Sequence, residues 1–272
     1  MKKHFTTTVL LALLFISCTK DDLRINNNII VLGHGGMGIN QTYPMNTFES
    51  IIKCLNIGTS GSEIDVQLTK DSVLVAYHSK NLSDHTNLFG TINDFNWSEI
   101  ENAFYVSTPY LNYPLLSLDH LFSNIPNLNE HLFTFDCKLY TNSNALNFKE
   151  AYINSLSKII DKYDLKSNVY IESQDTIFLI KLKEREPYYK LFIYPPSFDE
   201  GFNIALDLGL YGITISTSDV SPEQIEIAHS NNLKVAIWNT HSENKNIEGV
   251  NKGPDFIQTD KVKHLVNLLR YD

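Results

Sequence analysis

The chain alternates between short apolar runs of strand length and segments whose apolar residues recur at helical spacing. The first run, Ile29-Ile30-Val31-Leu32, is continuous, which is typical of a strand buried on both faces. It leads through a glycine-rich loop to a segment with helical periodicity from Phe48 to Leu55. Strands of this kind are predicted at 29–32, 63–68, 132–138, 169–171, 191–194, 212–215, 235–238 and 256–259. Eight strands alternating with helices predict one α/β domain over 28–272, a (β/α)₈ TIM barrel.

The second run, residues 62–78, differs because polar and apolar residues alternate within it. In an extended strand Glu63 and Asp65 share one face. The polar residues 69–72 predict a hairpin turn, so the chain doubles back antiparallel after this strand. A two-residue turn would place His78 directly opposite Glu63. The pattern therefore predicts a hairpin excursion that gathers two carboxylates and a histidine. A half-buried hairpin with solvated acids is the plainer alternative.

Residues 79–131 are too many for an ordinary barrel loop. We expect them to form a small insertion at the barrel mouth, with short helices near 97–103 and 117–122.

The first residues have the pattern of an export signal. Two lysines precede a short apolar run, Val9 to Ile16, which ends in Ser17-Cys18 and is too short to span a bilayer stably. This pattern resembles a bacterial lipoprotein signal. We expect residues 1–17 to be a signal peptide, Cys18 to be lipidated, and residues 18–27 to be a tether. The protein is then extracytoplasmic and membrane-anchored, on the periplasmic side or at the cell surface; secretion with a free Cys18 is the alternative.

The charge balance argues against one class of partner. The whole chain has a formal net charge of −9, and removal of the signal leaves 20 basic and 31 acidic residues. An acidic chain of this kind is not expected to bind nucleic acid. Cys54 and Cys137 lie in apolar periodic segments, so they are predicted to be buried free thiols.

Polar residues interrupt the apolar strands near their carboxyl ends, which converge on one pocket in a barrel. Carboxylates brought together there would repel one another unless a cation neutralised them, and hard oxygen ligands favour Mg²⁺ or Ca²⁺. Histidines beside one such divalent cation supply a general acid and a general base, and a lysine can balance phosphate charge. The implied reaction is metal-assisted phosphodiester cleavage. The residues concerned are His34, Glu63, Asp65, His78, Asp136, Lys138 and Trp238.

Two further residues are not assigned to this site. Glu172 could join it or merely cap the following helix. His241 lies just beyond Trp238, but its position is more typical of a solvated loop histidine.

The same residues resemble the glycerophosphodiester phosphodiesterase family across essentially the whole chain after the signal. The family's opening His-Arg-Gly is similar to His34-Gly35-Gly36, and its Pro-Glu-Asn-Thr is similar to Pro44-Met45-Asn46-Thr47. Its Glu-x-Asp-Val with a later histidine is similar to Glu63-Ile64-Asp65-Val66 with His78. Its Glu-x-Lys is similar to Asp136-Cys137-Lys138, its late tryptophan to Trp238, and its closing Thr-Asp to Thr259-Asp260.

The resemblance implies hydrolysis of glycerophosphodiesters to glycerol phosphate and an alcohol. It makes His34 and His78 the acid–base pair. It makes Glu63, Asp65 and Asp136 the metal ligands, and it places Lys138 and Trp238 at the substrate.

Three positions depart from the family pattern. Gly35 stands in place of a phosphate-contacting arginine, Met45 replaces a glutamate, and Asp136 is one methylene shorter than the usual ligand. A lost arginine removes a bidentate phosphate contact, so Gly35→Arg is expected to restore affinity for phosphate. The alternative function is a catalytically inactive barrel lipoprotein that binds phosphodiesters or other anionic ligands.

Overall fold

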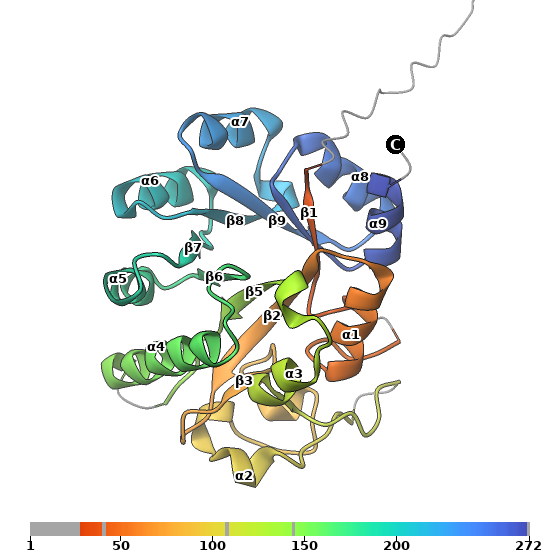
Figure 1. Ribbon diagram of the computed structural model, residues 1–272, viewed down its shortest axis with the longest axis vertical. Coiled ribbons are helices and arrows are strands. Elements are labelled where there is room, and N and C mark those ends of the chain that lie inside the picture. Colours follow the sequence, from red (N-terminus) through yellow and green to blue (C-terminus); the bar gives the residue numbers. More distant parts are fainter. Residues whose placement is uncertain (1–27, 40–41, 107–108, 143–144, 271–272) are drawn as a thin grey trace, which may run out of the picture.

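In the computed structural model, which describes residues 28–39, 42–106, 109–142 and 145–270, eight parallel strands close into a barrel (Figure 1). β1 pairs with β10 on one side and with β2 on the other, which closes the ring. The predicted TIM barrel is confirmed. The strands are, in ring order, β1 (Ile30–Gly33), β2 (Gly61–Leu68), β5 (Leu132–Cys137), β6 (Val169–Ser173), β7 (Lys190–Ile193), β8 (Gly212–Ser216), β9 (Lys234–Thr240) and β10 (Phe256–Thr259).

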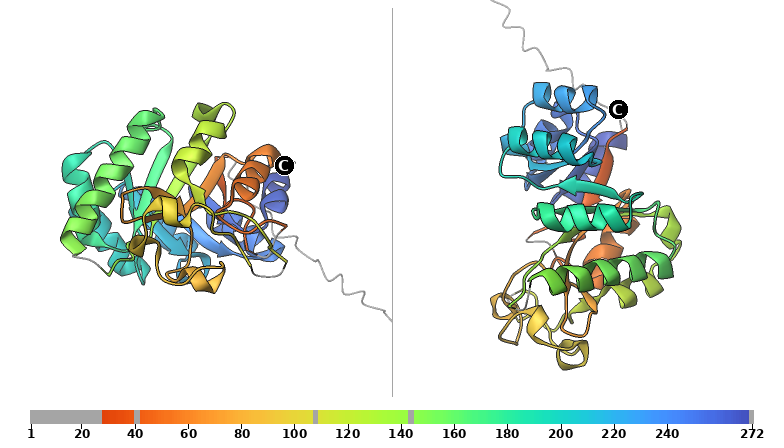
Figure 2. Two further views of the ribbon diagram at one scale, coloured as in Figure 1. Left: turned by 90° about the horizontal axis from the view of Figure 1, so that it is seen from below. Right: turned by 90° about the vertical axis from the view of Figure 1, so that its left-hand side faces the viewer.

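Helices surround the strands, as Figures 1 and 2 show. They are α1 (Phe48–Ile57), α3 (Leu118–Asn124), α4 (Ala145–Lys162), α5 (Thr176–Arg185), α6 (Phe198–Leu208), α7 (Pro222–Ser230), α8 (Glu243–Lys252) and α9 (Val262–Arg270). Their starts follow the local sequence: the Thr47 side chain accepts the backbone N–H of Ser50 at α1, and Ser221 forms a capping box with Gln224 at α7.

The inside of the barrel is filled at one end by aromatic side chains. The Tyr170 and Phe256 rings lie 4.8 Å apart and Phe192 packs on Phe256 at 5.6 Å. Alternate residues of a strand share a face, so Glu172 points inward two positions after Tyr170. The aromatic cluster therefore closes the amino-terminal end of the barrel and leaves the carboxyl end to polar residues.

β3 (Leu74–Ala76) runs antiparallel to β2, which confirms the predicted hairpin excursion, but the predicted pairing is wrong by one residue. Val66 pairs with Ala76, so His78 is not opposite Glu63. The cause is the turn: the backbone N–H of Thr69 donates to the carbonyl of Val73, which leaves three residues in the loop, and Ser72 takes a positive φ of 69°. A loop of three residues instead of two shifts the pairing register of the hairpin by one position.

The segment after the hairpin builds its own small core beside the barrel mouth. Tyr77, Ile92, Ile100 and Leu115 are buried together there. The predicted short helices are present as α2 (Trp97–Ile100) and α3. α3 packs on the barrel wall, with Phe122 against Phe133 at 5.2 Å between ring centres, so it serves as the barrel helix between β2 and β5. The remaining short elements are η1 (Leu82–Asp84), η2 (Ile92–Asp94), β4 (Leu116–Ser117), η3 (Leu128–Glu130) and η4 (Thr217–Asp219).

Cys54 and Cys137 are buried free thiols, as predicted. The predicted signal peptide, the lipidated Cys18 and the tether lie outside the described residues. Within the described part of the chain, no helix is both long enough and apolar enough to cross a bilayer.

Candidate active site

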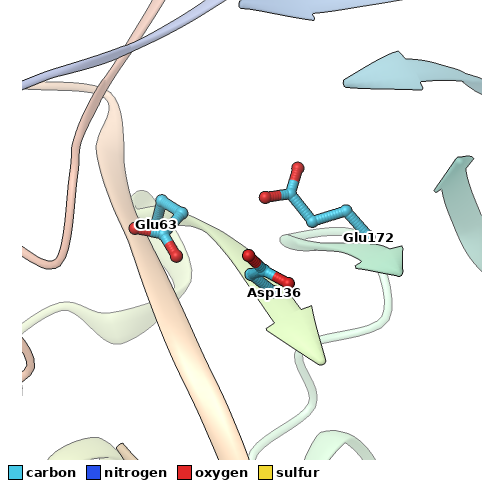
Figure 3. A group of neighbouring side chains, drawn as sticks. All are labelled: Glu63, Asp136 and Glu172. Atoms are coloured by element: carbon cyan, nitrogen blue, oxygen red, sulfur yellow. The ribbon is translucent and has the colours of Figure 1, made fainter. Parts of the chain in front are cut away.

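Three buried carboxylates converge inside the carboxyl end of the barrel. Glu63 on β2, Asp136 on β5 and Glu172 on β6 each offer an oxygen within 4.8 Å of the others, and Figure 3 shows their carboxylates pointing toward one another. β2, β5 and β6 are neighbours, with Asp136 directly beside Glu172 in the register. The parallel register of these strands thus assembles an acidic cluster from residues far apart in sequence.

The cluster has the properties of a cation site. Burial raises the pKa of Glu63 well above its ordinary value, and the charges of Asp65, Asp136 and Glu172 raise it further. Burial and Asp136 likewise raise the pKa of Glu172 to about 8. A bound cation would relieve this desolvation and repulsion. Because every donor is a hard carboxylate oxygen, the residues fit a divalent ion such as Mg²⁺ or Ca²⁺.

Lys138 and Asp65 lie beside the cluster as an ion pair. The Lys138 Nζ is 3.1 Å from the Asp65 Oδ1 and also binds Asp136. Asn46 donates to the other Asp65 oxygen at 2.7 Å. Burial would raise the pKa of Asp65, but Lys138 and His78 lower it below its ordinary value. Asp65 is therefore adjacent to the three converging carboxylates rather than one of them, and its role as a metal ligand stays a prediction.

Glu172, which the sequence left unassigned, is part of the cluster. Its Oε2 accepts the Thr214 hydroxyl at 2.6 Å, and Gln258 donates to both oxygens at 3.0 and 3.1 Å. Thr214 and Gln258 come from β8 and β10, across the barrel. The alternation of inward positions along its strand would have identified it, since it follows the inward Tyr170 by two residues.

Asp260, at the end of β10, holds two histidines. The His34 Nδ1 lies 2.8 Å from the Asp260 Oδ1, and the His241 Nδ1 contacts the Asp260 Oδ2. An ionised carboxylate can only accept, so the His34 Nδ1 carries the proton and the Nε2 is the atom left to exchange protons. Burial lowers the pKa of His34, but the hydrogen bond and charge of Asp260 more than offset this and raise it. His241 is thus fixed to the site rather than free in a loop.

We expect Asp260→Asn to lower kcat by about tenfold or more, below the ~10²–10⁴ attributed to a whole general acid or base. An asparagine removes the negative charge that raises the pKa of His34, so the limb of the pH–rate profile that reports His34 should move to lower pH. The measurement is kcat and kcat/KM against pH.

Asp255→Asn is the matched control, because Asp255 pairs with His229 at 2.8 Å away from the site. This variant should leave the shape of the pH profile unchanged. A profile of Asp260→Asn that superimposes on the parent's would refute the positioning role.

The two predicted catalytic histidines line one cavity and the predicted phosphate-binding lysine lines another. His34 and His78 border a cavity of about 310 Å³. Lys138 and Asp136 border a second one of about 330 Å³. Trp238 is in neither lining; its ring packs edge-on against Tyr194 at 5.5 Å, and its buried indole N–H has no partner among the described residues. The catalytic roles of His34 and His78 and the substrate-binding roles of Lys138 and Trp238 stay predictions.

The structure overturns the expectation for Gly35→Arg. Gly35 has a φ of 53°, and a Cβ added there would lie 2.7 Å from both the Cβ and the Cε of Met45. A side chain in this left-handed conformation costs about 1–2 kcal/mol before the clash is counted. The single substitution should therefore strain the loop rather than add a phosphate contact.

Comparisons with known proteins point to one family. The model of the Glycerophosphoryl diester phosphodiesterase family matches residues 37–264. A glycerophosphodiester phosphodiesterase from Caldanaerobacter subterraneus is 26% identical over 245 residues, which cover 89% of this chain and 98% of that protein.

Solved structures share the fold. A phosphodiesterase from Oleispira antarctica, solved with the product sn-glycerol-3-phosphate, has a TM-score of 0.76 and 19% identity, covering 87% of this chain and 95% of that one. A glycerophosphodiester phosphodiesterase from Parabacteroides distasonis has a TM-score of 0.75 and 19% identity, covering 89% and 97%. This chain belongs to the glycerophosphoryl diester phosphodiesterase family and is an enzyme of that family, a phosphoric diester hydrolase.

Proposed function

We propose that this enzyme hydrolyses glycerophosphodiesters to glycerol phosphate and an alcohol, using His34 and His78 as its acid–base pair and one divalent cation. The observation that carries the proposal is the arrangement of the site. Both histidines border one cavity, and Asn46 of the same cavity donates to Asp65, which pairs with Lys138 next to the acidic cluster.

The residues divide the reaction between them. One histidine takes a proton from the attacking water as its oxygen bonds to phosphorus, and the other donates a proton to the oxygen of the leaving alcohol as its bond to phosphorus breaks. The Asp260 contact keeps the His34 ring oriented with its Nε2 available for this exchange. Lys138 offers a permanent positive charge to the phosphate, because Asp65 and Asp136 offset the effect of its burial and raise its pKa above the ordinary value. A bound divalent cation would stabilise the charge that develops on the phosphate oxygens.

For the cation we propose Mg²⁺ or Ca²⁺, held by Glu63 and Asp136 together with Asp65. One observation favours Asp65 over Glu172 as the third ligand. Lys138 lowers the pKa of Asp65 despite burial, whereas burial and Asp136 raise the pKa of Glu172 to about 8, so Asp65 is the more readily ionised of the two carboxyls.

The test is an assay of the purified protein on glycerophosphodiesters, with and without a chelator. We expect release of glycerol phosphate that the chelator abolishes and that Mg²⁺ or Ca²⁺ restores. Turnover that is insensitive to the chelator would contradict the proposal that the enzyme needs a divalent cation. The alternative, an inactive binding lipoprotein, is not favoured by membership of an enzyme family. It would be supported if the protein showed no turnover but bound its ligands with an affinity that depends on the same carboxylates.

We further propose that Cys18 is lipidated and anchors the barrel to a membrane outside the cytoplasm. The support is the sequence alone: an apolar run that ends in Ser17-Cys18. Cys18→Ser should move the protein from the membrane to the soluble fraction after cell fractionation. Equal distribution of parent and variant between the fractions would contradict the anchor.

A further inference from the structure

The cavity beside the two histidines is walled mainly by apolar and aromatic side chains. Its lining includes Ile39, Pro44, Met45, Tyr77, Tyr105 and Tyr110. At about 310 Å³ it is at the lower end of the size of ordinary small-molecule pockets. It is formed where the loop after β1 meets the segment after the hairpin, so it belongs to the barrel mouth.

Two tyrosine hydroxyls and one amide of this wall are already engaged in hydrogen bonds. The Tyr77 hydroxyl donates to the carbonyl of Asn81 at 3.0 Å, and the Tyr105 hydroxyl donates to the carbonyl of Met45 at 3.1 Å. Both functional atoms of the Asn46 amide are bonded to Asp65. The Tyr77 and Tyr105 rings therefore present carbon, not hydroxyl, to a ligand.

The lining also lacks an acidic side chain that could pair with a cation. Among the described residues that border the cavity there is no lysine, arginine, aspartate or glutamate, and the titratable bases there are His34, His78 and His85. A cationic or zwitterionic group placed there would lose its hydration without gaining a counter-ion. Tyr77 and Tyr105 are tilted onto each other at 6.2 Å and are almost fully buried, so they do not form an open aromatic cage for an ammonium group.

The second cavity is of the opposite kind. It is bordered by Asp136, Lys138, Ser173 and Asp175. Among the described residues that border the two cavities, Lys138 carries the positive charge that complements an anionic phosphate, and a cation bound at the acidic cluster would add to it. We therefore place the phosphate near Lys138. The histidine that serves as general acid must reach the leaving oxygen, and both His34 and His78 line the apolar cavity. The leaving oxygen therefore lies at the edge of this cavity, next to space into which the rest of the alcohol can extend.

We propose that this cavity is the subsite for the leaving alcohol and that it selects an uncharged, apolar alcohol over the charged or polyhydroxylated alcohols of other glycerophosphodiesters. The inference rests on the proposed function and adds the class of its preferred substrate.

The experiment compares kcat/KM for glycerophosphodiesters whose alcohol is ethanol, butanol, hexanol, choline or glycerol. Each methylene moved from water to an apolar wall contributes about fourfold, so we expect a gain of more than tenfold from ethyl to butyl. The choline and glycerol diesters should fall below the butyl diester. A flat alkyl series, or a choline diester used better than the butyl one, would overturn the inference while leaving the proposed function intact. Absence of turnover on every diester would overturn both.

Two variants tie the preference to this wall. Met45→Gln keeps a similar length but adds a polar amide, and Tyr110→Ala removes a partly exposed ring, so it does not threaten the core. Each should lower the butyl-to-ethyl ratio of kcat/KM several-fold. Leu111→Gln is the control, because Leu111 is 55% exposed in the same segment and does not border the cavity. An unchanged ratio in both lining variants would refute the assignment of this wall.

Discussion

His78→Ala is expected to lower kcat on a glycerophosphodiester by about 10²–10⁴-fold, the loss typical of a general acid or base. Affinity for the divalent cation should stay close to that of the parent, because His78 borders the neighbouring cavity and does not belong to the acidic cluster. Turnover and calorimetric titration with Mg²⁺ or Ca²⁺ measure the two properties separately. His34→Ala should behave in the same way, since both histidines act in one proton exchange.

His131→Ala provides the control for this experiment. His131 immediately precedes β5, at the opposite end of the barrel from the acidic cluster, so its loss should leave kcat unchanged. If His78→Ala retains turnover within about threefold of the parent, far short of the effect of a general acid or base, the proposed mechanism is wrong.

Asp65→Asn is expected to weaken both cation affinity and turnover. The substitution removes a buried negative charge next to Lys138, so the positive charge of the lysine is no longer balanced by Asp65. A neutral amide is also a poorer ligand for a hard divalent ion. Titration calorimetry and kcat at saturating metal are the measurements, and we expect cation affinity to fall by more than one order of magnitude, consistent with loss of a metal-site residue.

Glu172→Gln is the matched comparison, since it also replaces a buried carboxylate by its amide. It keeps an acceptor for Thr214 and Gln258, so its effect on cation affinity should be smaller than that of Asp65→Asn. The reverse order would make Glu63, Asp136 and Glu172 the ligand set and would remove Asp65 from it.

The barrel could be predicted because its signals are local. Each strand is a short apolar run, and each following helix has its own apolar periodicity, as in β1 with α1. The hairpin register could not be predicted in the same way. It depends on whether the turn holds two or three residues, and this was decided by Ser72 adopting a positive φ, which a serine adopts only in a few contexts.

The site was predicted where its residues lie within a few positions of one another or match a motif, as with Glu63 and Asp65. It was missed where a residue's role depends on partners across the barrel. Glu172 at a strand end is equally compatible with a helix cap until Thr214 and Gln258 are placed beside it. His241 is likewise compatible with a solvated loop until Asp260 is placed within reach.

The contact between His34 and Asp260 also makes activity a reporter of folding. The two residues are 226 positions apart, at the ends of the first and last strands, which pair only when the ring closes. A chain that has formed most of its barrel but has not yet docked β10 contains both candidate catalytic histidines and the acidic cluster, yet His34 lacks its carboxylate partner. During refolding, catalysis should therefore appear together with docking of the final strand and after most of the secondary structure. The enzyme cannot become fully active before its last segment is in place.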